Sequence, residues 1–342
     1  DSGVQVEDQS FSGNAAYRLN TQVKSNRNFI EKDGFGLGDK AVYTNIAKLG
    51  TGYAITAMPV DNNYIYVAWT DSSGDQVSGS WSMATNNALT DYSLFETQAG
   101  FSLLWIDNDD TDYNTGDSVL KIANRSAGGV LTTDTLFVET NDAFSPLAAT
   151  GCYCPSNGET FTGMILEDSN GDAQLRLRYE DGISVLTRNM SGGVRNLPWS
   201  VHTTEVRTNE IAVSYQSDNL QIQVKLLPHS KNSINEQIEI GTTNTTAYIS
   251  ASQAVSKMRV VPLTSTTFAL VYKLQNTTDI EIVVYDEWNQ PIKTKTLSNV
   301  LTNTFHGFDV TPTSNGMTLA YIGTDRRVVV QELTAELYNK AP

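Results

Sequence analysis

The stretch that decides the fold spans residues 279–299 and reads DIEIVVYDEWNQPIKTKTLSN. Apolar and polar residues alternate at its start, Asn-Gln-Pro interrupts them, and the alternation then resumes. Alternation with a period of two predicts β-strands, because successive side chains of a strand point to opposite faces of a sheet. The polar segment between the two runs predicts a turn. We therefore expect two adjacent antiparallel strands here.

Similar pairs of runs recur along the chain, each with a polar turn rich in Asp, Asn or Gly between the two runs. They occupy residues 52–75, 100–126, 160–182, 210–228, 267–291 and 317–334. Their starts are 48 to 60 residues apart, with a mean of 53. No stretch of 12 or more residues has the apolar spacing of an amphipathic helix. The sequence therefore predicts an all-β protein with six copies of one unit.

A six-bladed β-propeller is the expected arrangement of these copies. Repeats of roughly 40 to 50 residues with several short strands each are typical of propellers, in which every repeat forms one four-stranded blade. A single small sheet cannot bury both of its faces, whereas sheets stacked around an axis bury them against each other. Residues 279–299 then supply the third and fourth strands of the fifth blade. Further strands are expected at residues 40–50, 77–86, 130–141, 183–193, 234–244 and 257–265.

The two ends of the chain determine how such a ring closes. Little sequence follows the last hairpin, whereas residues 1–35 precede the first blade and contain the strand-like NAAYRLNTQV. We expect an N-terminal arm at residues 1–35 and a propeller at residues 36–342, with the N-terminal strand completing the sixth blade. The alternatives are a flexible leader and a strand that pairs with a neighbouring molecule. A seven-bladed ring, with residues 1–44 as a degenerate blade, is the fallback.

The stretch at residues 279–299 also resembles the blade ends of bacterial and extracellular propeller repeats, in which a strand leads into an Asp, an aromatic residue and a Pro-containing turn. The resemblance implies a fold and no particular activity, because propellers include enzymes, lectins and scaffolds. The Asp-box of sialidases, Ser-x-Asp-x-Gly-x-x-Trp, is absent, as is the Gly-His/Trp-Asp signature of the WD type.

Charge and composition exclude several classes of partner. The formal net charge of −15 repels nucleic-acid phosphates and anionic lipid headgroups. No window approaches the roughly 20 apolar residues of a membrane-spanning helix. The chain opens with Asp1, which is typical of a processed secretory protein and also of a trimmed one. We expect a secreted or cell-surface protein whose partners are proteins, including further copies of this chain, or glycans.

Ion and modification sites are predicted at several positions. Residues 107–117 read DNDDTDYNTGD, and oxygen ligands at alternate positions suit calcium, although this loop equally suits a solvated acidic turn. The calcium ligands would be Asp110, Asp112, Asn114 and Asp117. Glycosylation sequons begin at Asn124, Asn189, Asn244 and Asn276, about as many as chance would give in a chain so rich in Asn, Ser and Thr.

The two cysteines, Cys152 and Cys154, have one residue between them, so they either form a strained disulfide, bridge to another chain or stay reduced. A zinc site normally needs four ligands, and only His202, His229 and His306 add imidazoles, so the ligand count argues against zinc.

Motifs for catalysis are missing. Gly-x-Ser-x-Gly, a phosphate-binding P-loop and a dinucleotide fingerprint are all absent, and no pair of carboxylates stands out. Trp288 lies in the predicted turn at 286–291 and is expected to be an exposed contact residue. The sequence therefore favours a non-enzymatic extracellular structural or adhesive protein, such as a subunit of a surface assembly or filament that uses N-terminal strand pairing. The alternatives are a carbohydrate-binding, lectin-like propeller and a polysaccharide-processing enzyme.

Overall fold

The structure is a computed structural model of the 342-residue chain. It describes residues 22–23, 29–32, 41–50, 52–59, 64–70, 81–84, 91–98, 100–107, 119–126, 131–136, 144–155, 158–168, 170, 172–180, 185–192, 194, 201–231, 238–241, 244–301, 307–324 and 328–337. Within these residues every regular element is a β-strand, and no helix is long and apolar enough to cross a membrane.

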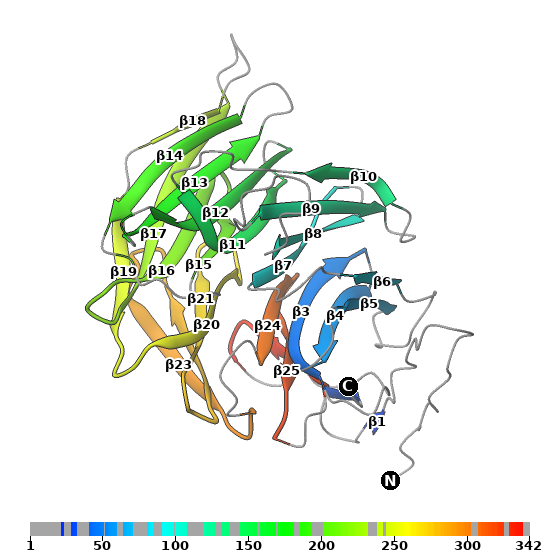
Figure 1. Ribbon diagram of the computed structural model, residues 1–342. Helices are drawn as coiled ribbons and strands as arrows, with labels where there is room; N and C mark the ends of the chain where they lie inside the picture. Colours follow the sequence, from blue (N-terminus) through cyan, green and yellow to red (C-terminus); the bar gives the residue numbers. More distant parts are fainter. Residues whose placement is uncertain are drawn as a thin grey trace.

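The strands form six sheets, which we call blades, arranged as a ring in chain order (Figure 1). Each blade begins with its innermost strand. Blade 1 comprises β3 (Ala41–Leu49), β4 (Gly52–Pro59), β5 (Tyr64–Thr70) and β6 (Trp81–Ala84). Blade 2 comprises β7 (Asp91–Glu96), β8 (Gly100–Asp107), β9 (Val119–Ser126) and β10 (Leu131–Leu136). Blade 3 comprises β11 (Phe144–Cys154), β12 (Glu159–Asp168), β13 (Ala173–Glu180) and β14 (Val185–Gly192).

The other three blades follow in the same order. Blade 4 comprises β15 (Val201–Arg207), β16 (Glu210–Gln216) and β17 (Gln221–Lys231), and β17 pairs with both β18 (Ile238–Ile240) and β19 (Asn244–Ser250). Blade 5 comprises β20 (Val255–Pro262), β21 (Phe268–Leu274), β22 (Ile280–Tyr285) and β23 (Pro291–Leu297). Blade 6 comprises β24 (Phe308–Thr313), β25 (Gly316–Ile322) and β26 (Val328–Thr334), followed by β2 (Phe29–Lys32) and β1 (Gln22–Val23).

The prediction of a six-bladed propeller is confirmed. All six hairpins read from the sequence are the two central strands of a blade, and residues 279–299 form the third and fourth strands of blade 5. The innermost strands of neighbouring blades contact one another around the whole ring, from β3 through β7, β11, β15, β20 and β24 back to β3. The expectation missed four of these six innermost strands: β7, β11, β15 and β24.

The ring closes through a blade made from both ends of the chain, as expected. Strand β2 pairs antiparallel with β26, with Phe29 opposite Gln331 and Lys32 opposite Val328. Residues 29–32 therefore form the fourth strand of blade 6 in their own molecule, with β1 outside them, and they form no seventh blade. The rest of the arm lies outside the described residues except for β1, and the domain boundary at residue 35 stays a prediction.

The apolar cores lie between blades, because each sheet is covered on both faces by its neighbours. One core joins blades 3 and 4 around Phe161, Leu177 and Tyr215, and another joins blades 5 and 6 around Phe308 and Leu319. Similar clusters join blade 1 to blade 2, blade 2 to blade 3, and blade 4 to blade 5.

Candidate functional site

A cavity of about 550 Å³ lies on the ring axis and takes lining residues from the innermost strands of all six blades. At one end its lining is buried and includes Ile46, Arg259 and Asp309. At the other end it includes exposed residues at or just after the C-terminal ends of these strands, among them Glu96, Pro155, Thr208, Ser265 and Pro312. The cavity therefore has a buried floor and a mouth, and the mouth lies where the innermost strands end.

The floor holds a buried charge cluster of two cations and one anion: Lys257, Arg259 and Asp309. All three are at most 2% exposed. Arg259 Nε donates to Asp309 Oδ1 at 2.5 Å, and Lys257 Nζ lies 3.8 Å from the same oxygen. Asn45 Oδ1 accepts hydrogen bonds of 3.2 Å from both Lys257 Nζ and Arg259 Nη2. The cluster carries a formal charge of +1, in contrast to the net negative charge of the whole chain.

Side chains around the axis also cap the backbone of the neighbouring blade. The innermost strand of a sheet has one edge without a strand partner, and its N–H groups need acceptors. Ile46 N donates to Asp309 Oδ2 at 2.9 Å, and Lys48 N donates to Thr311 Oγ1 at 3.0 Å. Thr203 N likewise donates to Thr150 Oγ1 at 2.9 Å. In each pair the acceptor belongs to the blade that precedes the donor in the ring.

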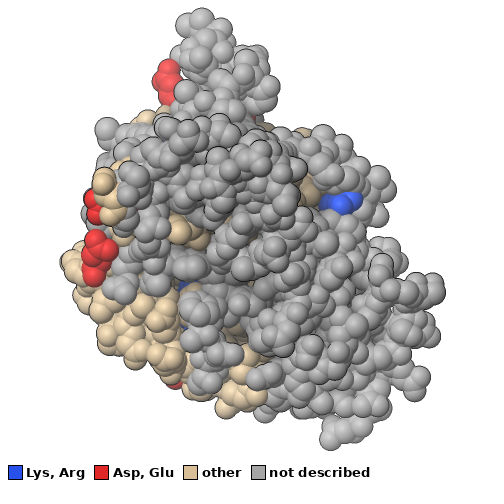
Figure 2. All heavy atoms as spheres, viewed as in Figure 1, with Lys and Arg blue, Asp and Glu red and all other residues tan. Residues whose placement is uncertain are grey.

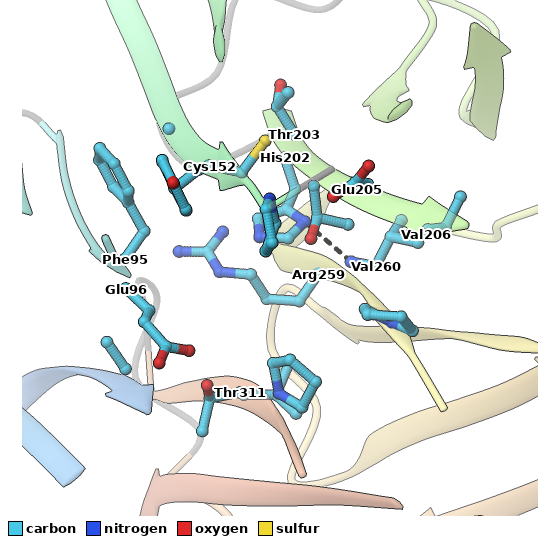
Figure 3. Close-up of a pocket in the computed structure, with 18 of the residues that line it drawn as sticks. Phe95, Glu96, Cys152, His202, Thr203, Glu205, Val206, Arg259, Val260 and Thr311 are labelled. Carbon is cyan, nitrogen blue, oxygen red and sulfur yellow. Dashed lines mark hydrogen bonds between the residues drawn. The ribbon is translucent and has the colours of Figure 1, made fainter. Parts of the chain in front are cut away.

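His202 caps a backbone N–H of the following blade in the same way, and this hydrogen bond defines the tautomer of its ring. Its Nδ1 accepts a hydrogen bond of 2.9 Å from Val260 N, drawn as the dashed line in Figure 3. Nδ1 is therefore unprotonated, and the neutral ring carries its proton on Nε2. Burial, together with the positive charges of Arg259 and Lys257, lowers the pKa of His202 well below its usual range. At neutral pH the ring thus offers one N–H donor.

The walls combine a rigid aromatic ring with polar side chains. Phe95 lies against the backbone of Gly151, where an added Cβ would come within 2.4 Å of the ring. Glu96, next in β7, is exposed at the mouth, and partial burial of its carboxyl group raises its pKa. Arg207 is held at the opposite wall by Glu210 Oε2 at 2.7 Å and by the carbonyl of Asp286 at 3.1 Å. Figure 3 shows Phe95 and Glu96 across the cavity from Thr203 and Glu205.

A second cluster of reactive groups lies beside this wall, between blades 3 and 4. One ligand atom each from Cys154, Glu205 and His229 lies within 4.8 Å of the other two. His229 Nε2 is 3.7 Å from Glu205 Oε1. Both Cys152 and Cys154 are buried free thiols, so the disulfide that the sequence allowed is not formed. The adjacent Cys152 thiol, burial and nearby carboxylates raise the pKa of Cys154.

The residues singled out from the sequence lie elsewhere. The acidic loop with Asp110, Asp112, Asn114 and Asp117 lies outside the described residues, so calcium binding there stays a prediction. Asn124 is on β9, where it bonds with Ser102, and Asn189 and Asn244 are on β14 and β19. Asn276 is exposed in the turn after β21. Their glycosylation stays a prediction.

Trp288 is 73% exposed in the turn between β22 and β23, where its backbone N–H donates to Asp286 Oδ1 at 2.9 Å. Its role as a contact residue stays a prediction.

Figure 2 shows acidic side chains at the outer rim of the molecule, beside β18 and β19.

No family model and no curated protein matches this chain by sequence. In structure it is similar to the fucose-specific lectin from Aleuria aurantia, with a TM-score of 0.60 and 8% identity over 88% of this chain and 96% of the lectin. It is similar to the Hadza microbial sialidase Hz136, with a TM-score of 0.60 and 9% identity over 85% of this chain and 65% of the sialidase. A protein of unknown function from Dyadobacter fermentans gives a TM-score of 0.56 and 11% identity over 90% and 97% of the two chains. At these identities the likeness concerns the fold alone, and by its fold this chain is a six-bladed β-propeller.

Proposed function

We propose that this chain is a carbohydrate-binding, lectin-like propeller that holds a short sugar segment in the axial cavity. The observation that carries the proposal is a cavity of about 550 Å³ whose wall joins an aromatic ring to both hydrogen-bond donors and acceptors. Sites for small ligands typically have volumes of about 300–1,000 Å³. Sugar hydroxyl groups donate and accept at once, so they are bound best where both kinds of partner are fixed in place.

The cavity supplies fixed partners of both kinds. The Nε2–H group of His202 is a donor, and its direction is set because Nδ1 is already bonded to Val260 N. The carboxylate of Glu96 at the mouth is an acceptor. Phe95, packed against Gly151, contributes an apolar patch to the wall of the cavity, against which the C–H groups of a sugar can lie. Groups held in place before binding lose little conformational entropy when the ligand arrives.

Sugar recognition by related architectures supports the proposal at the level of fold. The Aleuria aurantia lectin, described as a six-bladed β-propeller, has been solved in complex with alpha-methyl-L-fucoside and with Fucalpha1-6GlcNAc. Its identity to this chain is too low for its sugar or its binding residues to be transferred. The sugar bound by this chain is therefore to be identified by experiment.

The test is a glycan array probed with the fluorescently labelled full chain, followed by calorimetry on the sugars that bind. Two variants locate the site. His202→Asn keeps an acceptor for Val260 N, because the amide oxygen of Asn takes the place of Nδ1, and it replaces the Nε2–H donor by an amide N–H that lies closer to the backbone. Glu96→Gln removes the charge at the mouth without changing the size of the side chain. We expect each variant to weaken binding by about tenfold, since His202→Asn withdraws one donor and Glu96→Gln takes the charge from one acceptor, each worth roughly 1.4 kcal/mol.

Trp288→Ala is the matched control, because it removes the exposed aromatic residue on the outer turn of blade 5. We expect this variant to bind as the wild type does. If it loses binding while the cavity variants keep it, the sugar binds at the periphery and the axial site is wrong. An array without any signal at millimolar-range sensitivity refutes the carbohydrate proposal itself.

Polysaccharide processing is the second candidate, because it requires inward-facing carboxylates and the cavity has three: Glu96, Glu205 and Asp309. Asp309 is committed to Arg259 and Ile46 N, which leaves Glu96 and Glu205 as the pair to consider. Incubation of the array sugars with the chain, followed by mass spectrometry, distinguishes the candidates. Cleaved products that disappear in Glu96→Gln favour the enzyme, and intact sugars favour the lectin.

Assembly through the N-terminal strand and a secreted location stay predictions. Residues 29–32 occupy the edge of their own β26, so assembly would require an exchange of this strand between molecules. Light scattering after size-exclusion chromatography, on the full chain and on a chain without residues 1–32, tests the exchange. If the full chain is a monomer at every concentration, strand exchange between molecules is ruled out.

A further inference from the structure

The cluster between blades 3 and 4 brings together ligand types that the sequence keeps far apart. Cys154 ends β11, Glu205 is on β15 and His229 is near the end of β17. Their ligand atoms lie within 4.8 Å of one another, and the His229 Nε2 to Glu205 Oε1 distance is 3.7 Å. His229 has no exposed side-chain surface, and only 11% of the Glu205 side chain is exposed.

Two more donors adjoin these three. Cys152 lies two residues before Cys154 on the same strand, so both side chains point to the same face of the sheet. The two thiols are in hydrogen-bond contact. Glu159 is the cross-strand partner of Cys154 in β12 and is itself buried. Two thiols, one imidazole and two carboxyl groups therefore meet next to the apolar core around Phe161.

We propose that this cluster binds one zinc ion, with Cys152, Cys154, Glu205 and His229 as the four ligands. Thiolate, imidazole and carboxylate are the ligands that Zn²⁺ takes in proteins, and four of them complete a tetrahedral site. Binding replaces the two thiol protons, which pass to solvent, and no atom changes its oxidation state. Glu159 then lies beside the site as a carboxyl group outside the ligand set.

The distances among three of the four ligands fit this ion after small side-chain rotations. Tetrahedral zinc with bonds of about 2.0 Å to N and O and about 2.3 Å to S places its ligand atoms about 3.3–3.8 Å apart. The separation of 3.7 Å between His229 and Glu205 already lies in this range. The largest separation among Cys154, Glu205 and His229 is at most 4.8 Å, so these three ligands need to contract by about 1 Å. Cys152 Sγ lies outside this group and has to turn toward it, together with the neighbouring Cys154 thiol, to become the fourth ligand.

The place of the site indicates what the ion does. Cys152 and Glu205 line the axial cavity, which gives a solvent route to the cluster, and both are labelled in Figure 3. The ligands come from two blades, so the bound ion ties the innermost strand of blade 3 to the first and third strands of blade 4. A fully ligated ion is a structural clamp. The proposal is independent of sugar binding, since it assigns no role to a glycan.

The test uses the full chain, purified with a chelator and kept reduced, and then titrated with Co²⁺ as a spectroscopic substitute for Zn²⁺. We expect uptake of one ion per chain, a thiolate-to-cobalt charge-transfer band in the near ultraviolet, and the intense visible bands of tetrahedral cobalt. Zn²⁺ should displace the cobalt, remove the bands and raise the melting temperature. A reduced wild-type chain that takes up no stoichiometric cobalt overturns the proposal.

Three variants assign the ligands. Cys154→Ser should abolish the charge-transfer band or reduce it to at most half, and Cys152→Ser should halve it. Glu205→Gln, a partly exposed position with an isosteric side chain, should weaken metal affinity at least tenfold even if the serine variants fail to fold. His202→Asn is the control, because His202 lines the cavity outside the cluster, and it should bind cobalt normally. Wild-type spectra from both Cys154→Ser and Glu205→Gln would contradict the assignment.

Discussion

Replacement of Asp309 tests whether the buried charge cluster is a stabilising feature of the axis. Its carboxylate is 2% exposed and has a cation on two sides, Arg259 Nε at 2.5 Å and Lys257 Nζ at 3.8 Å. Its other oxygen accepts the N–H of Ile46. In Asp309→Asn the acceptor for Ile46 is kept and the negative charge is lost. Arg259 and Lys257 then lose the anion that they share.

The distances give the size of the effect. Unit charges 3.8 Å apart attract by about 4 kcal/mol at an effective dielectric constant of about 20. Removal of one partner from a buried ion pair typically costs about 3–5 kcal/mol, because the remaining charge stays desolvated. We expect Asp309→Asn to lower the free energy of unfolding by about this amount. Asp309→Ala should cost about 1–3 kcal/mol more, since Ile46 N then also loses its acceptor.

Urea denaturation followed by tryptophan fluorescence and by circular dichroism measures both variants, and coincidence of the two curves checks for two-state unfolding. The double variant Asp309→Asn with Arg259→Met also removes one of the two cations that lose their shared anion. It should therefore be more stable than the sum of the single effects predicts. The reasoning is refuted if Asp309→Asn costs less than about 1 kcal/mol, because the cluster would then be hydrated rather than buried.

Three further predictions concern single side chains. First, His202 takes up a proton near pH 6.5 in the unfolded chain, whereas the folded ring resists protonation, so wild-type stability should fall as the pH drops below about 6.5. Urea titrations at several pH values measure this fall. In His202→Asn the free energy of unfolding should fall less steeply, by up to about 1.4 kcal/mol per pH unit. Second, burial lowers the pKa of Lys273 to about 8, so Lys273→Met should stabilise the fold by about 1–3 kcal/mol at pH 7. This gain in stability should shrink between about pH 8 and 10.5, where folding no longer has to bury a charged amine. A gain that is constant with pH would contradict burial as the cause. Third, the Cβ of Gly151→Ala would lie 2.4 Å from the Phe95 ring, so this variant should lose about 1–3 kcal/mol in the same urea assay, whereas unchanged stability would mean that the ring moves freely.

The sequence predicted the parts of the fold in which each strand faces an apolar core. The two central strands of a blade are covered on both faces and carry apolar runs, such as FALVYKL in β21 and IEIVVY in β22. Their period, and the turns between them, were therefore visible. Strand β15 reads VHTTEVR and β24 reads FDVTPT, with few apolar residues. These innermost strands were missed because their side chains cap neighbouring backbones or line the cavity.

The candidate sites were hidden for the same reason. Arg259 and Asp309 are 50 residues apart, and Asn45 lies more than 200 residues before both, so no local motif joins them. Cys152 and Cys154 were recognised as a pair, but the count of nearby ligands argued against zinc. The ring places Glu205 and His229 beside Cys154 only because blades 3 and 4 pack face to face. Glu205 on the first strand and His229 on the third strand of the blade after the two cysteines are the signal that a search by blade position would have used.

The caps around the axis explain why the polar residues of the innermost strands are compatible with a buried ring. Each innermost strand has one edge that no strand covers, and a buried N–H without an acceptor costs about 1–3 kcal/mol. Asp309, Thr311, Thr150 and His202 each accept one such N–H from the following blade. Their polarity is therefore part of the contact between blades rather than a defect of the core. Asp309 Oδ2 and His202 Nδ1 cap backbone N–H groups, which fixes the orientation of Asp309 Oδ1 and of the His202 Nε2–H group. The fold itself therefore aligns these polar groups of the axial cavity.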